Sequence, residues 1–269
     1  MAAEPPTLST ILTSFLNEAK TAVLLTYNQP KISNAFTIAQ YHDLAAALTW
    51  AKHHPTIITI VLTGAGKHYC AGKVLLSPDE GGPTIAEEIA AGSALGNVIR
   101  NYPKVLIAAV NGAAIGWGCT QLWNFDLVYA SERAFFQTPF TKLGFVPEGG
   151  SSYTFLKVMG RAKAMRLLLG SERVSARDMA ENGFVTEVLP AEGFVEAVCA
   201  KAKTIAGYPQ ESVRLVKELC AKSQEELDAV RSASERERVA LQRVLSGDAA
   251  KKAMSDLGSG RGRGSCDLR

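Results

Sequence analysis

One carboxylate, Glu148, is a candidate acid/base catalyst, although its position alone is also that of an ordinary helix-start residue. It stands in the run Pro147-Glu148-Gly149-Gly150, after the apolar stretch 143–146 and at the expected start of a helix. A carboxylate at a helix N-terminus commonly does no more than complement the helix dipole. The apolar stretch and the two glycines instead favour a partly buried position. Desolvation there raises the pKa of a carboxyl group and makes it a usable base.

Two glycine-rich turns could supply the electrophilic partner for such a base. One covers residues 64–72 and the other 111–118, and each follows a strand of buried character. Glycines let the backbone approach a ligand closely, and one free amide from each turn could together polarise a carbonyl group. Ordinary strand-to-helix turns have the same composition, so spacing alone leaves both interpretations open. Neither turn is a P-loop or a complete GxGxxG fingerprint.

Other chemistries find little support in the sequence. The four histidines, at 42, 53, 54 and 68, lack the spacing of a triad or a metal site, so no metal is predicted. The five cysteines, at 70, 119, 199, 220 and 266, form no CxxC pair and are interpreted as free thiols of a reducing compartment. The net charge of +3 is too small a bias to indicate nucleic acid as a partner.

Targeting and membrane signals are also weak. No apolar run approaches the roughly 18 residues that a membrane span requires. Residues 1–9 contain no Lys or Arg, so neither a secretory signal nor a basic transit peptide is expected. A simple Ser-Lys-Leu-type peroxisomal ending is absent. Residues 258–269 are expected to form a flexible tail by composition.

The elements that must position these groups alternate between strands and helices in the first half of the chain. Strands are predicted at 21–26, 56–62, 105–110, 126–130 and 134–137, with helices at 36–53, 84–101 and up to residue 123. Helices then dominate, at 150–159, 162–169, 176–182, 192–206 and 224–245. The alternation favours ββα or βαβ units over a sandwich, and the β-branched run 56–62 indicates a sheet covered on both faces.

Three stretches resemble the crotonase (enoyl-CoA hydratase/isomerase) superfamily: residues 61–72, 108–131 and 138–160. The third, TPFTKLGFVPEGGSSYTFLKVMG, resembles the peroxisomal type of Δ3,Δ2-enoyl-CoA isomerase, as does the stretch 176–190. The resemblance, which extends over about 21–220, implies an α/β fold: a crotonase-like spiral of repeated ββα units with a helical C-terminal part. Residues 1–205 are then expected to form the spiral core and 206–257 a helical trimerisation part.

The resemblance implies roles for individual residues. Glu148 falls on the isomerase base, and the backbone N–H groups of Ala71 and Trp117 fall on the oxyanion hole. Hydratases of the superfamily use two carboxylates to hold and activate water, and here those positions are Thr120 and Phe140. Hydration by that mechanism is therefore not expected. The residues expected in the acyl pocket are Phe140, Thr120, Phe136 and Phe145.

The implied reaction moves the double bond of a 3-enoyl-CoA thioester to the 2,3 position, with Glu148 carrying a proton from C2 to C4. Coenzyme A enters as part of the substrate, and no metal, nicotinamide or flavin cofactor is expected. Lys31 and Lys73 are candidates for binding the CoA phosphates, a solvated surface lysine being the alternative for each. Many relatives carry an aspartate at the position of Val74, so details of CoA anchoring are open.

The resemblance also implies a homotrimer or a hexamer built from trimers. It implies a peroxisomal location, with the cytosol as the alternative. Two other functions stay open: a crotonase-fold tailoring enzyme acting on another acyl-CoA or polyketide thioester, and a catalytically silent homologue. The presence of Glu148 argues against silence, because a silent homologue is free to lose it.

Overall fold

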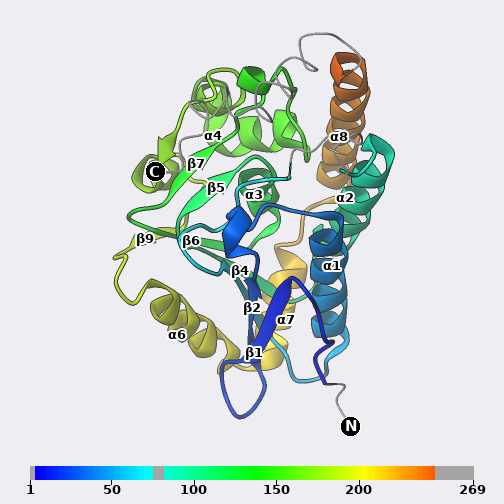
Figure 1. Cartoon of the computed structure of the whole chain (residues 1–269). Helices are drawn as coiled ribbons and strands as arrows, with labels where there is room; N and C mark the ends of the chain where they lie inside the picture. Colours follow the sequence, from blue (N-terminus) through cyan, green and yellow to red (C-terminus); the bar gives the residue numbers. More distant parts are fainter. Residues whose placement is uncertain (1–3, 75–81, 246–269) are drawn as a thin grey trace.

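A six-stranded sheet forms the centre of the molecule in the computed structural model, which describes residues 4–74 and 82–245 (Figure 1). The strand order is β1-β2-β3-β4-β6-β9; β1 and β2 are antiparallel and each later pair is parallel. A second sheet has the order β5-β7-β8. The strands are β1 (Ile11–Phe15), β2 (Ala22–Tyr27), β3 (Thr59–Gly64), β4 (Val105–Val110), β5 (Ala113–Ile115), β6 (Leu127–Ser131), β7 (Phe135–Gln137), β8 (Val174–Ser175) and β9 (Glu187–Leu189).

Helices connect and cover these strands. The α-helices are α1 (Ile38–His53), α2 (Ile85–Ile99), α3 (Trp117–Thr120), α4 (Ser151–Leu168), α5 (Ala176–Glu181), α6 (Phe194–Ala206), α7 (Gln210–Leu219) and α8 (Gln224–Leu245). The short 3-10 helices are η1 (Pro30–Ile32), η3 (Gln121–Asn124) and η4 (Thr141–Leu143). In the first half each parallel crossover carries a helix: α1 between β2 and β3, α2 between β3 and β4, and α3 between β4 and β6. Parallel pairing requires such long crossovers.

Strands β3 and β4 are buried along their whole length because helices cover both faces of the sheet. Successive side chains of a strand point to opposite faces. Ile60 and Leu62 therefore join the core cluster that contains Leu44 of α1, whereas Val61 packs in a separate cluster with Val198 of α6. This two-sided burial explains why the β-branched run predicted at 56–62 shows no polar alternation.

The side chain of Asn111 ties the two glycine-rich turns together. Its amide nitrogen donates to the carbonyls of Gly64 and Gly66, both at 3.0 Å, and its amide oxygen accepts from the Gly64 N–H at 3.2 Å. Gly112 lies so close to the first turn that an added Cβ would be 2.0 Å from the Lys67 carbonyl oxygen. The turns after β3 and β4 are thus held as one unit, and only glycine fits at the contact.

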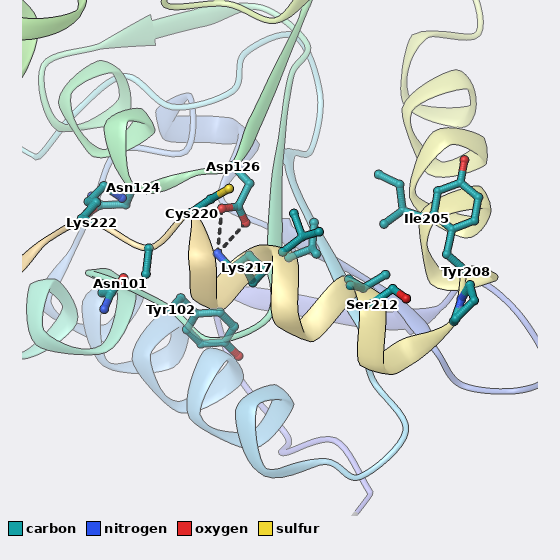
Figure 2. A pocket seen from close by; sticks show the side chains of 15 residues that line it. Asn101, Tyr102, Asn124, Asp126, Ile205, Tyr208, Ser212, Lys217, Cys220 and Lys222 are labelled. Atoms are coloured by element: carbon teal, nitrogen blue, oxygen red, sulfur yellow. Dashed lines mark hydrogen bonds and ion pairs between the residues drawn. The ribbon is translucent and has the colours of Figure 1, made fainter.

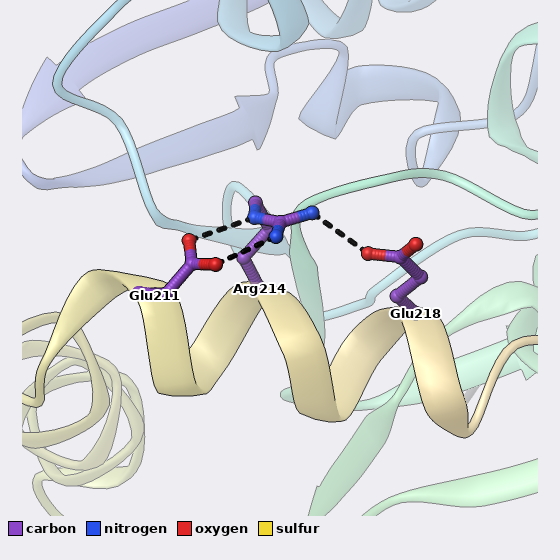
Figure 3. Close-up of polar contacts among 3 residues, drawn as sticks. All are labelled: Glu211, Arg214 and Glu218. Atoms are coloured by element: carbon purple, nitrogen blue, oxygen red, sulfur yellow. Dashed lines mark hydrogen bonds and ion pairs between the residues drawn. The ribbon is translucent and has the colours of Figure 1, made fainter.

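The C-terminal helices pack back on the half that carries Glu148. Helix α8 lies along α4, which is interrupted at Gly160 (φ 72°, ψ 160°), so the two predicted helices 150–159 and 162–169 are confirmed as two segments. Helix α7 carries exposed apolar side chains, with Leu219 84% exposed. On the charged side of this helix, Arg214 forms ion pairs with Glu211 and Glu218 at 2.7 Å each (Figure 3).

The predicted α/β class and the helical C-terminal part are confirmed. The short strands β1, β5, β8 and β9 were not predicted, because two to five residues carry too little periodicity to identify a strand. The ten-residue helix α7 was not predicted either. Residues 113–115, expected within a glycine-rich turn, form β5, and the helix expected up to residue 123 is divided into α3 and η3. The tail 258–269 lies outside the described residues, and the division into parts stays a prediction. Within the described ranges, no helix is both long and apolar enough to cross a membrane.

Candidate active site

Glu148 lies in the loop between η4 and α4, on backbone that glycine shapes. Gly149 (φ 68°) and Gly150 (φ 80°) both adopt left-handed conformations that other residues rarely take. A Cβ on Gly149 would be 3.1 Å from the Thr120 hydroxyl, and a Cβ on Gly150 would be 2.8 Å from Cγ1 of Val230 in α8. The two glycines therefore let the loop turn tightly into α4 while Glu148 stays close to α3.

The pKa of Glu148 is shifted into the neutral range. The pKa is raised to about 7, and burial is the largest cause. The Lys73 ammonium lowers the pKa, and the carboxylates of Glu237 and Glu88 raise it. The Glu148 carboxylate has no hydrogen-bond partner among the residues that the structure describes. Because both protonation states are populated near pH 7, this side chain can take up a proton and return it.

Two backbone amides near Glu148 are without acceptors. Lys73 forms a parallel bridge with Phe36: the Phe36 N–H donates to the Gly72 carbonyl at 2.8 Å, and the Val74 N–H donates to the Phe36 carbonyl at 3.0 Å. This pairing leaves the Lys73 N–H directed away from Phe36, without an acceptor in the described part of the chain. Trp117 opens α3, where first-turn amides lack intrahelical acceptors, and its N–H likewise has no partner there.

The two amides and the carboxylate meet in one small cavity. An added Cβ on Gly116 would lie 3.7 Å from the Gly72 Cα and 3.8 Å from the Glu148 Oε1, so the residues preceding Trp117 and Lys73 are neighbours beside the carboxylate. The cavity has a volume of about 60 Å³. Its remaining lining is largely apolar: Ala71, Ile115, Pro139, Phe140, Leu143, Phe145, Val146 and Leu241. A carbonyl group polarised by the two amides would lie beside Glu148 in a largely apolar space.

The prediction of Ala71 as an oxyanion-hole donor is wrong. Its N–H donates to the Ser33 carbonyl at 3.0 Å and is therefore occupied within the fold. The available amide is two residues further on, at Lys73, because the bridge to Phe36 uses the peptide groups on either side of it. The N–H of Trp117, the other expected donor, has no acceptor within the described ranges, and its role in an oxyanion hole stays a prediction.

The four residues expected in the acyl pocket lie in different places. Phe140 and Phe145 line the small cavity. Phe136 is fully buried in the core on β7 and does not reach either cavity beside Glu148. Thr120 is 1% exposed and lies behind Gly149, where its hydroxyl has no hydrogen-bond partner within residues 4–74 and 82–245.

The two lysines expected to bind CoA have different surroundings in the structure. Lys31 is exposed on η1 and lines neither cavity beside Glu148. The Lys73 ammonium forms an ion pair with Glu88 of α2 at 2.6 Å, with both side chains about one-fifth exposed. A contact of either lysine with a CoA phosphate stays a prediction.

Two further carboxylates lie near Glu148, and sequence reasoning missed both of them. Glu237 of α8, 6% exposed, accepts hydrogen bonds from the N–H groups of Gly150 at 2.7 Å and Ser152 at 2.8 Å. The carboxylate of Glu88 forms the ion pair with Lys73 described above. No local pattern reveals these contacts, because Glu237 and Gly150 are 87 positions apart.

A larger cavity lies away from these groups, beneath α7 (Figure 2). Its volume is about 640 Å³, and its polar residues include Asp126 and Lys217, which form an ion pair at 2.7 Å. Neither glycine-rich turn contributes to it. Its one carboxylate is already paired, so the chemistry belongs to the cavity at Glu148. No group of three His, Cys, Asp or Glu side chains in the described ranges is placed to hold a metal ion.

Comparisons with known proteins indicate the family of the chain. A family model described as enoyl-CoA hydratase/isomerase matches residues 17–256. Enoyl-CoA delta isomerase 2 of Rattus norvegicus is 42% identical over 206 residues, which are 75% of this chain and 52% of the relative. Enoyl-CoA delta isomerase 3, peroxisomal, of Mus musculus is 36% identical over 206 residues, which are 75% of this chain and 65% of the mouse relative. The chain thus spans about half the length of the rat relative.

Solved structures share the whole arrangement. An enoyl-CoA hydratase/isomerase from Pseudoalteromonas atlantica T6c superposes with a TM-score of 0.80 at 28% identity, covering 94% of this chain and 98% of the other. An enoyl-CoA hydratase from Mycobacterium avium subsp. paratuberculosis K-10 gives 0.82 at 25% identity, covering 94% and 97%. The expected crotonase fold is therefore confirmed. The family model matches most of the chain, and two turns and a loop are placed around one cavity. The chain therefore belongs to the enoyl-CoA hydratase/isomerase family.

Proposed function

We propose that this chain isomerises 3-enoyl-CoA thioesters to 2-enoyl-CoA thioesters, with Glu148 as the proton carrier. One observation carries the proposal. Three carboxylates lie close together here, and those of Glu88 and Glu237 already have ion-pair or hydrogen-bond partners. The third, Glu148, faces the two available amides and has a pKa of about 7. The names of the rat and mouse relatives, both delta isomerases, support the same reaction.

The reaction balances with one carboxylate. The thioester oxygen accepts hydrogen bonds from the N–H groups of Lys73 and Trp117, which acidifies the C2–H bond. Glu148 removes a C2 proton, and the electron pair spreads over C2, C3, C4 and the thioester oxygen as a dienolate. The Glu148 carboxylic acid then donates the proton to C4, so the double bond moves from C3–C4 to C2–C3. The enzyme returns to its starting state, and coenzyme A takes part only as the carrier of the acyl group.

The residues around Glu148 favour proton transfer over water addition. Hydration needs a second group to activate water, and the family positions for it hold the Thr120 hydroxyl and the Phe140 ring. Phe140 and Phe145 make that side of the small cavity apolar. A dienolate in such a space is protected from water until it is reprotonated.

The proposal is tested with the purified chain and 3-hexenoyl-CoA, by following formation of the conjugated 2-enoyl thioester in the ultraviolet. Replacing Glu148→Gln should lower kcat by roughly 10²- to 10⁴-fold, the usual contribution of a positioned acid/base. Binding of a saturated acyl-CoA should be retained. The matched control is Glu211→Gln on the exposed side of α7, which should keep full activity.

Three results would contradict the mechanism. An active Glu148→Gln enzyme would show that another group carries the proton. Conversion of 2-hexenoyl-CoA to the 3-hydroxy product would identify a hydratase. Tight acyl-CoA binding without any turnover by the unmodified chain would favour a tailoring enzyme for another thioester, or a silent homologue.

The same proposal includes the wider setting expected from the family. The chain would act as a homotrimer or a hexamer of trimers, on acyl-CoA substrates of fatty acid metabolism, with Lys31 and Lys73 candidates for contact with CoA phosphates. A peroxisomal location is supported by the peroxisomal mouse relative. Fractionation of the native cells with a peroxisomal marker tests the location.

A further inference from the structure

A second cavity continues from Glu148 between α2 and α8, which lie side by side in Figure 1. Its volume is about 520 Å³, and it shares Lys73, Trp117, Glu148 and Leu241 with the small cavity. That volume is in the range of sites that take whole small-molecule ligands. If the thioester carbonyl of the proposed reaction rests on the two free amides, one end of the substrate must extend into this space.

The cavity is elongated along both helices. It is lined on α2 from Glu88 to the C-cap Arg100, and on α8 from Leu241 back to Arg231. At a rise of 1.5 Å per residue these stretches measure about 18 Å and about 15 Å. Two residues mark the end of the cavity at the reaction centre. Glu88 forms an ion pair with Lys73, and Leu241 lines both cavities. Arg100 and Arg231 therefore lie together at the far end.

The α2 side of the wall between the two ends consists mostly of small and polar residues. It presents Gly92, Ser93, Gly96 and Asn97, with Ile89 as its aliphatic side chain. The glycines leave room for a chain to pass. The far end carries the cations Arg100 and Arg231, so the space fits a chain whose far end is anionic.

Arg100 is a half-buried cation without a counter-ion in the described part of the chain. The residue is only partly exposed, and its guanidinium has neither a hydrogen bond nor an ion pair there. Burial lowers the pKa of Arg100, and the neighbouring cation Arg231 lowers it further. Arg231 has a partner, Asp228 at 2.5 Å, and Arg238, which lines the same cavity, pairs with Glu235. An anion arriving in the cavity would offset the desolvation of Arg100.

We propose that the substrate is an acyl-CoA whose chain ends in a carboxylate, and that Arg100, with Arg231 beside it, binds that carboxylate. The inference rests on the isomerase function proposed for the same site. A guanidinium can hold a carboxylate through two parallel hydrogen bonds, which fixes the end of the chain as well as neutralising it. The distance of about 15 to 18 Å from the reaction centre selects chains long enough to reach Arg100.

The same cations could instead receive a phosphate if the coenzyme A arm occupied this cavity. The two sources differ in one respect. A carboxylate belongs to some acyl groups only, whereas the phosphates are present in every CoA ester. Preference between substrates that differ only at the chain end therefore separates them.

The test compares two 3-enoyl-CoA esters of equal chain length, one ending in a methyl group and one in a carboxylate. The unmodified enzyme should have the lower KM for the carboxylate-ended ester. Arg100→Met should raise that KM roughly 10- to 100-fold, the worth of a charged hydrogen-bonded pair, and leave the methyl-ended ester unchanged. Arg100→Lys should recover part of the loss. The matched control is Arg214→Met on α7, an arginine that already has carboxylate partners away from both cavities.

Two other results would overturn the proposal. An equal rise in KM for both esters, together with weaker binding of free coenzyme A, would assign Arg100 to a phosphate. An unchanged KM for both esters would leave Arg100 without a ligand role. Calorimetric binding of the saturated carboxylate-ended and methyl-ended acyl-CoA esters gives the same comparison without turnover. A chain that binds the first more tightly through Arg100 but isomerises neither ester would refute the isomerase function alone, and thermal melting of each variant checks that it is folded.

Discussion

The pKa of Glu148 is set by burial and by three charged neighbours that come from different parts of the chain. Burial and the carboxylates of Glu88 and Glu237 raise its pKa, and the Lys73 ammonium lowers it. Proton removal from C2 needs the carboxylate form, whose population increases as pH rises through about 7. We expect kcat/KM for a 3-enoyl-CoA to rise through neutral pH and to level off above it. A profile already flat at pH 5 would contradict the raised pKa.

Two substitutions should move that profile in opposite directions. Lys73→Met removes a nearby positive charge but keeps the backbone N–H, so the pKa of Glu148 rises and the profile shifts to higher pH. Glu88→Gln removes a negative charge and frees the Lys73 ammonium, so the pKa of Glu148 falls and the profile shifts to lower pH. The measurement is kcat/KM against pH for both variants. Shifts in the same direction would show that the ion pair does not act on Glu148.

At the scale of elements, the base depends on the contact between α8 and α4. The Glu237 carboxylate accepts from the first amides of α4 and so fixes the loop that carries Glu148. Those amides are otherwise unsatisfied at a helix start, where a negative charge is also favoured by the helix dipole. A residue far along the sequence thus caps the helix at which the acid/base lies.

Glu237→Gln should therefore affect both stability and turnover. The amide keeps one accepting oxygen and places a donor against the other N–H, so we expect the free energy of unfolding in urea to fall by about 1–3 kcal/mol. We expect kcat to fall as well, because the loop of Glu148 is less well fixed. The exposed variant Glu211→Gln serves as control. A stability loss with an unchanged kcat would mean that Glu237 supports the fold but does not position the base.

At the scale of the whole molecule, the exposed apolar face of α7 is the feature that a single copy leaves uncovered. Leu219 is 84% exposed, and Val216 is 60% exposed on the same helix. Exposed apolar clusters of this kind are common at protein–protein contacts. The trimer or hexamer expected from the family would offer a surface to cover them.

Light scattering coupled to gel filtration tests this expectation. The unmodified chain should elute with the mass of three or six copies, and Leu219→Glu should reduce that mass by placing a charge on the apolar face. Leu12→Glu, at a 52% exposed position on β1, is the matched control and should change nothing. A monomeric unmodified chain would refute the oligomer, and an intact oligomer with Leu219→Glu would remove α7 from the contact.

The sequence by itself determined the elements whose residues carry a local signal. The β-branched run of β3, the helical spacing of α1 and α8, and the break near Gly160 are all encoded within a few residues. The glycines after Glu148 likewise predicted a tight turn into a helix, and the absence of carboxylates at Thr120 and Phe140 pointed away from hydration.

Only the tertiary structure decided which groups face one another. Which amide is free depends on the bridge between Lys73 and Phe36, so the donor expected at Ala71 moved by two residues. Phe136 and Phe140 look alike in sequence, but β7 directs the first into the core and the second lines the cavity. Contacts such as Glu237 with Gly150 depend on packing between distant segments, which no local pattern of residues records.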